Sequence, residues 1–139
     1  MNKVLLETLK ELKATLENGV NEALKTSYND IPYYVCNSLV SLNQLLENLK
    51  KFQEPYLAQL NSRKAKNDVY LVNSILQELI NILESSLEQE LGISKEQIIF
   101  KMDCFSADRK IILEALINLY KSLIKALKED IKEAQNTTL

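Results

Sequence analysis

Carboxylates are the side chains of this chain that come closest to a catalytic set, because the sequence contains no histidine. Without histidine there is no imidazole base, no Ser-His or Cys-His nucleophile pair and no imidazole metal ligand. Glu84, Glu88 and Asp103 could approach one another in a helical bundle. However, carboxylates on helices usually lie in water on the outer face. We therefore expect no catalytic residues and predict that the protein is not an enzyme.

The sequence also lacks the residues that metal and cofactor sites usually require. The two cysteines, Cys36 and Cys104, cannot complete a structural zinc site by themselves. The two glycines are too few for a phosphate-binding loop or a dinucleotide fingerprint. We expect no cofactor and no bound metal, and we interpret the cysteines as buried thiols of a reducing compartment.

The stretch "IPYYVCNSLVSLNQLL", residues 31–46, carries no formal charge in a chain otherwise rich in Lys and Glu. Protein interfaces are depleted of Lys and Glu at their centre and enriched in Tyr. Uncharged polar groups also avoid the cost of burying a charge. We predict a contact surface on these residues, covered by the carboxyl-terminal helix, a second copy of the chain or another protein. Its members are Tyr33, Tyr34, Asn37, Ser41 and Gln44.

Lysine spacing supports an alternative function. Lys121, Lys125, Lys128 and Lys132 follow steps of four and three, which place them along one stripe of a helix. A second basic cluster, Arg63, Lys64 and Lys66, lies in the predicted loop "NSRKAKN". These patches would suit a small helical subunit of a nucleoprotein assembly that contacts nucleic acid. Against this, a lysine stripe is usually a solvated helix face, and the net charge of −2 does not favour general nucleic-acid binding.

Four apolar periodicities predict the helices that must position these residues. The first runs through Leu5, Leu9, Leu12 and Leu16, with Gly19 on the same face, where it either allows a close helix approach or loosens the helix. "TSYNDIP" ends this helix, and Asn29 or Asp30 can cap the next one, with Pro32 in its first turn. The second periodicity contains Val35, Leu39, Leu42, Leu46 and Leu49.

Proline and glycine mark further boundaries. Pro55 predicts a kink or short break near residues 52–55. The third helix, which starts near Asn67 or Asp68, has an unusually wide apolar face and should be central in the bundle. "ELGIS" ends it, and Ser94 with Gln97 forms a capping box for the fourth. The apolar register from Ile98 to Ala126 allows one long helix or two helices with a break near Asp103–Asp108, and we favour a break or kink.

Arg109 falls on the apolar stripe of this last helical region. In one interpretation its stem lies along the bundle and its guanidinium reaches water. In the other it is partly buried, pairs with a carboxylate and fixes the helix register or receives a ligand. The sequence leaves both open.

Together these features predict a single all-α domain over residues 1–139, with residues 134–139 frayed. Short connections favour an antiparallel up-down four-helix bundle, with five helices as a variant. The charged amino terminus lacks a signal-peptide core, and the longest uncharged run is shorter than the roughly 18 residues of a membrane span. We therefore expect a cytoplasmic protein with no membrane contact.

In size, acidity and helix number the chain resembles small cytoplasmic export chaperones of the flagellar or type III kind. This resemblance implies a chaperone role. The residues themselves favour a broader prediction, a non-catalytic protein-binding module that acts as an adaptor, chaperone or regulatory subunit. Its partner would be another protein or a second copy of the chain.

Overall fold

The computed structural model describes residues 2–62, 67–89 and 106–137, and within these ranges every element is helical. The elements are α1 (Asn2–Lys25), the short 3-10 helix η1 (Tyr28–Asp30), α2 (Ile31–Asn61), α3 (Asn67–Gln89) and α5 (Ser106–Thr137). The predicted all-α class is confirmed. The basic loop residues Arg63, Lys64 and Lys66 and the capping box at Ser94 lie outside the described residues.

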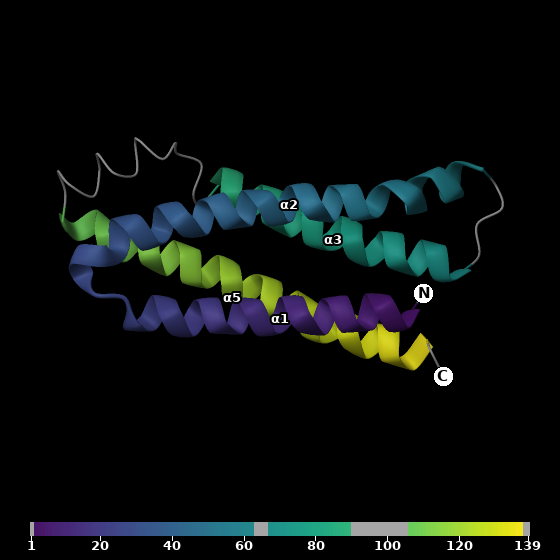
Figure 1. Ribbon diagram of the computed structural model, residues 1–139, viewed down its shortest axis with the longest axis horizontal. Helices are drawn as coiled ribbons and strands as arrows, with labels where there is room; N and C mark the ends of the chain where they lie inside the picture. The colour runs from purple at the N-terminus through teal and green to yellow at the C-terminus, as the bar shows by residue number, and fades with distance from the viewer. Residues whose placement is uncertain (1, 63–66, 90–105, 138–139) are drawn as a thin grey trace.

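The helices form an antiparallel up-down bundle, as predicted (Figure 1). Two pairs pack most extensively, α1 with α5 and α2 with α3, and α5 also contacts α2 and α3. The two ends of the chain lie at the same end of the bundle, and η1 lies at the opposite end (Figure 1). Because α1 packs on α5 and α2 packs on α3, the consecutive helices α1 and α2 belong to different pairs.

The wide apolar face of α3 is buried in the core, and α5 contributes a comparable buried face. Leu79 and Leu83 of α3 are each 0% exposed, and α3 packs against α2, α5 and α1. The apolar stripe of α1 contributes Leu5, Leu9 and Leu16 to the same cluster. The residues of α3 that are buried in the core are Val69, Val72, Ile75, Leu76, Leu79, Ile80 and Leu83.

The start of α2 matches the predicted position but not the predicted bond. Asp30 occupies the N-cap position and Pro32 lies in the first turn, yet no side chain caps the helix. Instead the Ser27 hydroxyl donates a hydrogen bond of 2.7 Å to the Asp30 carboxylate. The local pair Ser27–Asp30 thus replaces the capping bond that Asp30 could have accepted.

A break does not occur at Pro55, because α2 is one helix from Ile31 to Asn61 with Pro55 inside it. Proline removes one backbone hydrogen bond, so packing must hold the two sides together. Leu49 and Gln53 are buried just before the proline. The rings of Phe52 and Tyr56, on either side of it, lie 5.8 Å apart.

The last helix, α5, begins at Ser106, inside the range Asp103–Asp108 where a break or kink was predicted, and it is continuous from there. Asp103, the other bound of the predicted break, lies outside the described residues. The helix extends to Thr137, and Ala134 is buried. Residues 134–137 are therefore helical, although the sequence favours fraying there.

Candidate protein-binding site

The uncharged stretch forms the first half of α2, and most of its predicted contact residues are open to solvent. Tyr33 is 72% exposed, and Asn37, Ser41 and Gln44 are exposed as well. Tyr34 is half-buried. Among the residues that the structure describes, no other segment therefore covers this surface as a whole, although Ser38, in the same stretch, is buried.

Three of the five predicted residues line one hollow between α1 and α2. The α2 wall of the hollow consists of Tyr34, Asn37, Ser38 and Ser41. Tyr120 of α5, the helix that packs on α1, also lines it. The hollow has a volume of about 510 Å³. Its α1 wall consists of Thr15, Asn18, Gly19 and Glu22. Tyr33 and Gln44 are not in this lining; the Gln44 amide instead donates to Asn48 Oδ1 at 3.0 Å.

Two tyrosines connect the walls of this polar hollow. The Tyr34 hydroxyl donates a 2.7 Å hydrogen bond to the backbone carbonyl of Gly19. The Tyr120 ring lies so close to Gly19 that a Cβ there would be 3.2 Å from Tyr120 Cε2. Gly19 thus serves the close approach that was one of its two predicted roles. Burial, and then the neighbouring Tyr120, raise the pKa of Tyr34 to about 12, so its hydroxyl keeps the proton that it donates.

A second, apolar hollow of about 390 Å³ continues along the same two helices. Thr15 lines both hollows, so they are two halves of one groove, which we call the α1–α2 groove. Leu76 of α3 also contributes to the apolar half. Its other lining residues are Leu5, Thr8, Leu9, Glu11, Leu12 and Thr15 from α1 and Leu45, Asn48, Leu49 and Phe52 from α2.

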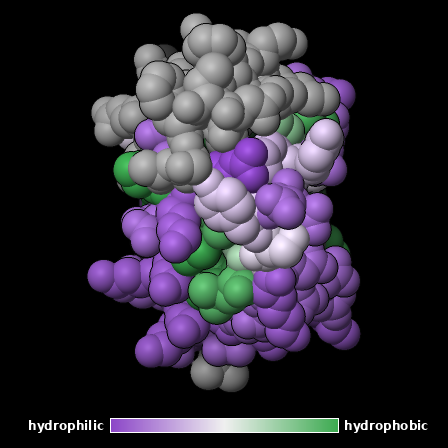
Figure 2. All heavy atoms as spheres, turned by 90° about the vertical axis from the view of Figure 1, so that its left-hand side faces the viewer, coloured by the Kyte–Doolittle hydropathy of each residue, from purple (hydrophilic) through white to green (hydrophobic). Residues whose placement is uncertain are grey.

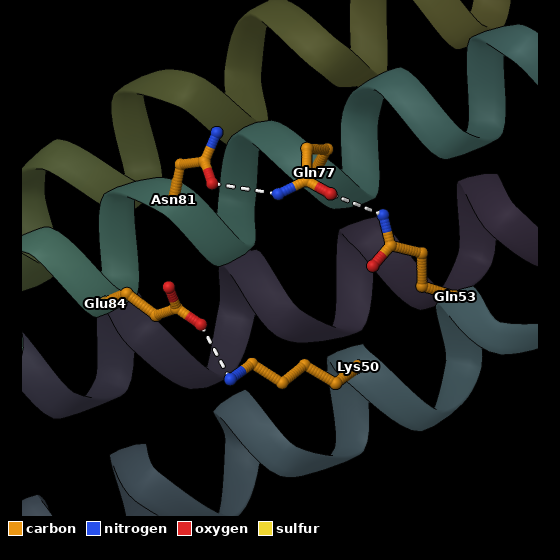
Figure 3. Close-up of polar contacts among 5 residues, drawn as sticks. All are labelled: Lys50, Gln53, Gln77, Asn81 and Glu84. Carbon is orange, nitrogen blue, oxygen red and sulfur yellow. Dashed lines mark hydrogen bonds and ion pairs between the residues drawn. The ribbon is translucent and has the colours of Figure 1, made fainter. Parts of the chain in front are cut away.

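A polar network joins α2 to α3. The buried Gln53 amide donates to Asn73 Oδ1 at 3.0 Å and to Gln77 Oε1 at 2.8 Å. Gln77 in turn donates to Asn81 at 2.9 Å (Figure 3). Because the Gln53 side chain is buried, removing its partners would leave its amide unsatisfied, which costs about 1–3 kcal/mol.

The ion pair between Lys50 and Glu84, at 2.6 Å, lies beside this network and also joins α2 to α3 (Figure 3). The Glu84 carboxylate was one of three that could have formed a catalytic group. Here it binds a lysine across two helices, while Asp103 and the side chain of Glu88 lie outside the described parts of the structure.

The lysine stripe of α5 lies on the outside of the bundle, where Lys121, Lys125, Lys128 and Lys132 are all exposed. Lys128 and Lys132 line a third hollow, of about 460 Å³, between α1 and α5. Lys10 and Lys13 of α1 line it too, and Lys13 pairs with Glu17 at 2.7 Å. The packing of α1 on α5 therefore brings two lysines of the predicted stripe, Lys128 and Lys132, together with two lysines of α1.

Arg109 is half-buried and joins η1 to the first turn of α5. Its guanidinium lies 4.7 Å from the centre of the Tyr28 ring, and Nη1 donates to the Tyr28 carbonyl at 3.2 Å. Figure 2 looks onto this end of the bundle, where apolar surface interrupts a largely hydrophilic one. Leu24, in the last turn of α1, and Ile111, in the second turn of α5, are exposed. The contacts with Tyr28 indicate a structural role for Arg109.

Asp130 of α5 is a buried acid in an acidic neighbourhood. Its side chain is 3% exposed, and Oδ2 has no hydrogen-bond partner in the described structure. Burial raises the pKa of Asp130 to about 7, and the charges of Glu78, Glu133 and Glu129 act in the same direction. Asp130 does not line the α1–α2 groove, so we treat it as a determinant of stability.

Within the described ranges, no three His, Cys, Asp or Glu side chains are grouped as a metal site requires. In those same ranges, none of the helices has the length and apolar character needed to cross a membrane. No protein family, curated protein or solved structure matches the chain. We therefore base the functional proposal on the geometry of the described helices.

Several residues of the groove and its support were missed by the sequence reasoning. The acids Glu11 and Glu22 and the small Thr15 gave no pattern of their own, because they become one surface only when α1 and α2 lie side by side. The buried Gln53 and Asp130 did carry a signal. Each lies four residues after an apolar stripe position, Leu49 and Ala126, and so continues that stripe with a polar residue.

Proposed function

We propose that this chain is a non-catalytic protein-binding module, an adaptor, chaperone or regulatory subunit, that binds its partner along the α1–α2 groove. One observation carries the proposal. The uncharged stretch of α2 is one wall of an open hollow, and Asn37 and Ser41 are exposed on that wall. These polar groups are accessible, so a second chain can bury them without burying a charge.

The outer face of α2 beside the groove supports the same proposal. Tyr33 is 72% exposed and Val40 is 60% exposed, with Asn37 and Gln44 on the same stripe. Spacings of three and four residues place these four side chains on one face. A tyrosine and a valine in an uncharged strip of surface are typical of the centre of an interface.

The test is the double variant Asn37→Lys with Ser41→Glu, which adds charge to the groove wall without touching the apolar stripe of α2. Because both positions are exposed, the free energy of unfolding should change by no more than about 0.5 kcal/mol. Capture of the partner from native lysate should be lost, because two charges would have to be buried at the contact. Melting and capture are measured on the same preparation.

The matched control is Asn118→Lys with Ser122→Glu on α5, an exposed Asn/Ser pair with the same spacing outside the groove. It should melt and capture like the unmodified protein. A groove variant that melts normally and still captures the same partner contradicts the proposal. Self-association is tested in the same preparations by sedimentation, since a second copy of the chain is one of the possible partners.

Nucleic acid is the second candidate partner, and the lysine cluster between α1 and α5 favours it. Four lysines and one acid, Glu17, line this hollow, so its lining carries a net positive charge. Glu17 forms an ion pair with Lys13 and also attracts Lys128. If this surface binds phosphates, the affinity for nucleic acid should fall steeply with salt. Lys10→Glu with Lys132→Glu should abolish it. If the affinity for nucleic acid does not change with salt concentration or with these two substitutions, nucleic acid is excluded as a partner of this surface.

A further inference from the structure

We infer that the ligand of the α1–α2 groove is an amphipathic helix of another protein, apolar on one face and carrying two Lys or Arg side chains about three turns apart. The inference rests on the proposed function and specifies the partner of the same site. The shape, the polarity and the charge of the α1–α2 groove each support the inference.

The shape of the groove suits a helix. Both walls are α-helices, so their backbone groups are bonded internally and offer no strand edge for an extended peptide to pair with. The lining extends from Leu5 to Glu22 on α1 and from Phe52 back to Tyr34 on α2. Each wall is therefore roughly 25 Å long at 1.5 Å per residue, which matches a helix of about 17 residues. Such a helix would lie on the groove and insert one face.

The polarity of the groove changes along its length. The half near Leu12 and Leu45 is lined mainly by leucines, and these two side chains and Phe52 are partly exposed, so it would accept apolar side chains at spacings of three and four. The half near Tyr34 is lined by hydroxyl and amide groups of Asn18, Asn37 and Ser41. It would accept small or uncharged polar side chains that can form hydrogen bonds. A bound helix should thus be apolar toward one end of its inserted face and polar toward the other.

The charge of the groove is one-sided. Glu11 and Glu22 are the only charged residues among those that line it. Neither carboxylate has an ion-pair partner in the described parts of the chain. Both lie on the same face of α1, about three turns and roughly 16 Å apart. Cations with the same separation on a bound helix would neutralise both acids.

The lysine cluster on the other side of α1 also favours binding of a basic helix in the α1–α2 groove. Lys10, Lys13, Lys128 and Lys132 surround the α1–α5 hollow, so a basic helix is repelled there and attracted to the α1–α2 groove. An acidic helix would instead be attracted to the α1–α5 hollow and repelled by Glu11 and Glu22 of the α1–α2 groove. The two faces of α1 would therefore direct a basic helix to one groove.

The test uses two synthetic peptides of about 18 residues with the same leucine face. One carries Lys at two flanking positions about three turns apart, and the other carries Glu at those positions. At low salt the Lys peptide should bind at least about tenfold more tightly, and the difference should shrink as salt screens the exposed charges. Equal affinity of the two peptides, or a preference for the Glu peptide, overturns the inference.

Protein variants locate the binding. Glu11→Gln with Glu22→Gln should weaken the Lys peptide by about three- to tenfold. The matched control is Glu17→Gln, an acid of the same helix that lines the α1–α5 hollow, and it should leave the affinity unchanged. Thr15→Trp places a large side chain at the junction of the two halves, at an exposed position, and should remove binding with little change in melting.

Each remaining outcome decides between the inference and the proposed function. If Thr15→Trp abolishes partner capture but the Lys peptide shows no preference, the groove is the binding site and the basic helix is wrong. If capture survives Thr15→Trp, the proposed function itself fails. If the protein sediments as a dimer that Thr15→Trp converts to a monomer, a second copy of the chain is the ligand, which also overturns the inference.

Discussion

Leu79→Ala and Leu83→Ala are each expected to lower the free energy of unfolding by about 2–5 kcal/mol. Both side chains are 0% exposed on α3, which packs against α2, α5 and α1. Removing three carbon atoms at such a position loses burial and leaves a cavity that close-packed neighbours fill only in part. Urea unfolding followed by circular dichroism measures the change.

The control for this pair is Val4→Ala on α1, where the side chain is largely exposed and little should change, within about 0.5 kcal/mol. A loss below about 1 kcal/mol at both leucines would mean that this face of α3 is not in the core. Such a result would contradict the bundle that positions the groove.

Asp130→Asn is expected to stabilise the protein above neutral pH, by about 2–4 kcal/mol at pH 8. The pKa of Asp130 is raised from an ordinary value of 3.8 to about 7, mainly by burial and then by the charge of Glu78. Between these two values the folded protein holds a proton that the unfolded chain has released. The unmodified protein should therefore lose stability as the pH rises from about 4 to about 7, and Asn, which does not ionise, should remove that loss.

The measurement is the free energy of unfolding of both proteins at a series of pH values from 4 to 8. The two curves should converge at low pH, where Asp130 is protonated in both states, and separate as the pH rises. Glu114→Gln, an exposed acid on the same helix, is the matched control and should show no such divergence. Parallel curves for Asp130→Asn would show that its carboxyl ionises freely in the folded protein.

The helices were predictable because each has a strong apolar stripe. The apolar periodicity of the third helix predicted a wide buried face, and seven apolar residues of α3 are buried in the core. Pro55 was harder, because local chemistry permits a break there. The continuous α2 depends on packing around Leu49 and Gln53, which the local sequence does not contain.

The groove was only half predictable, for a physical reason. The missing charges of residues 31–46 reveal one wall, since they are a property of one helix. The other wall, and the acids Glu11 and Glu22 on it, depend on which helices pair. An apolar stripe indicates that one side of a helix is buried, but it does not indicate which other helix covers that side. Here α1 packs most extensively on α5, which comes last in the chain, and leaves its side toward α2 open.

The most direct test of the α1–α2 groove as the binding surface is a solution NMR titration of the isotope-labelled full chain with the Lys peptide. The groove predicts shifts of amide and methyl signals along both walls, centred on Leu12, Thr15, Ser41 and Leu45. Signals of Ile131 and Lys128, at the α1–α5 hollow, should stay unchanged. Shifts that gather around that hollow instead, or a bound peptide that leaves the signals of Thr15 and Ser41 in place, would contradict it.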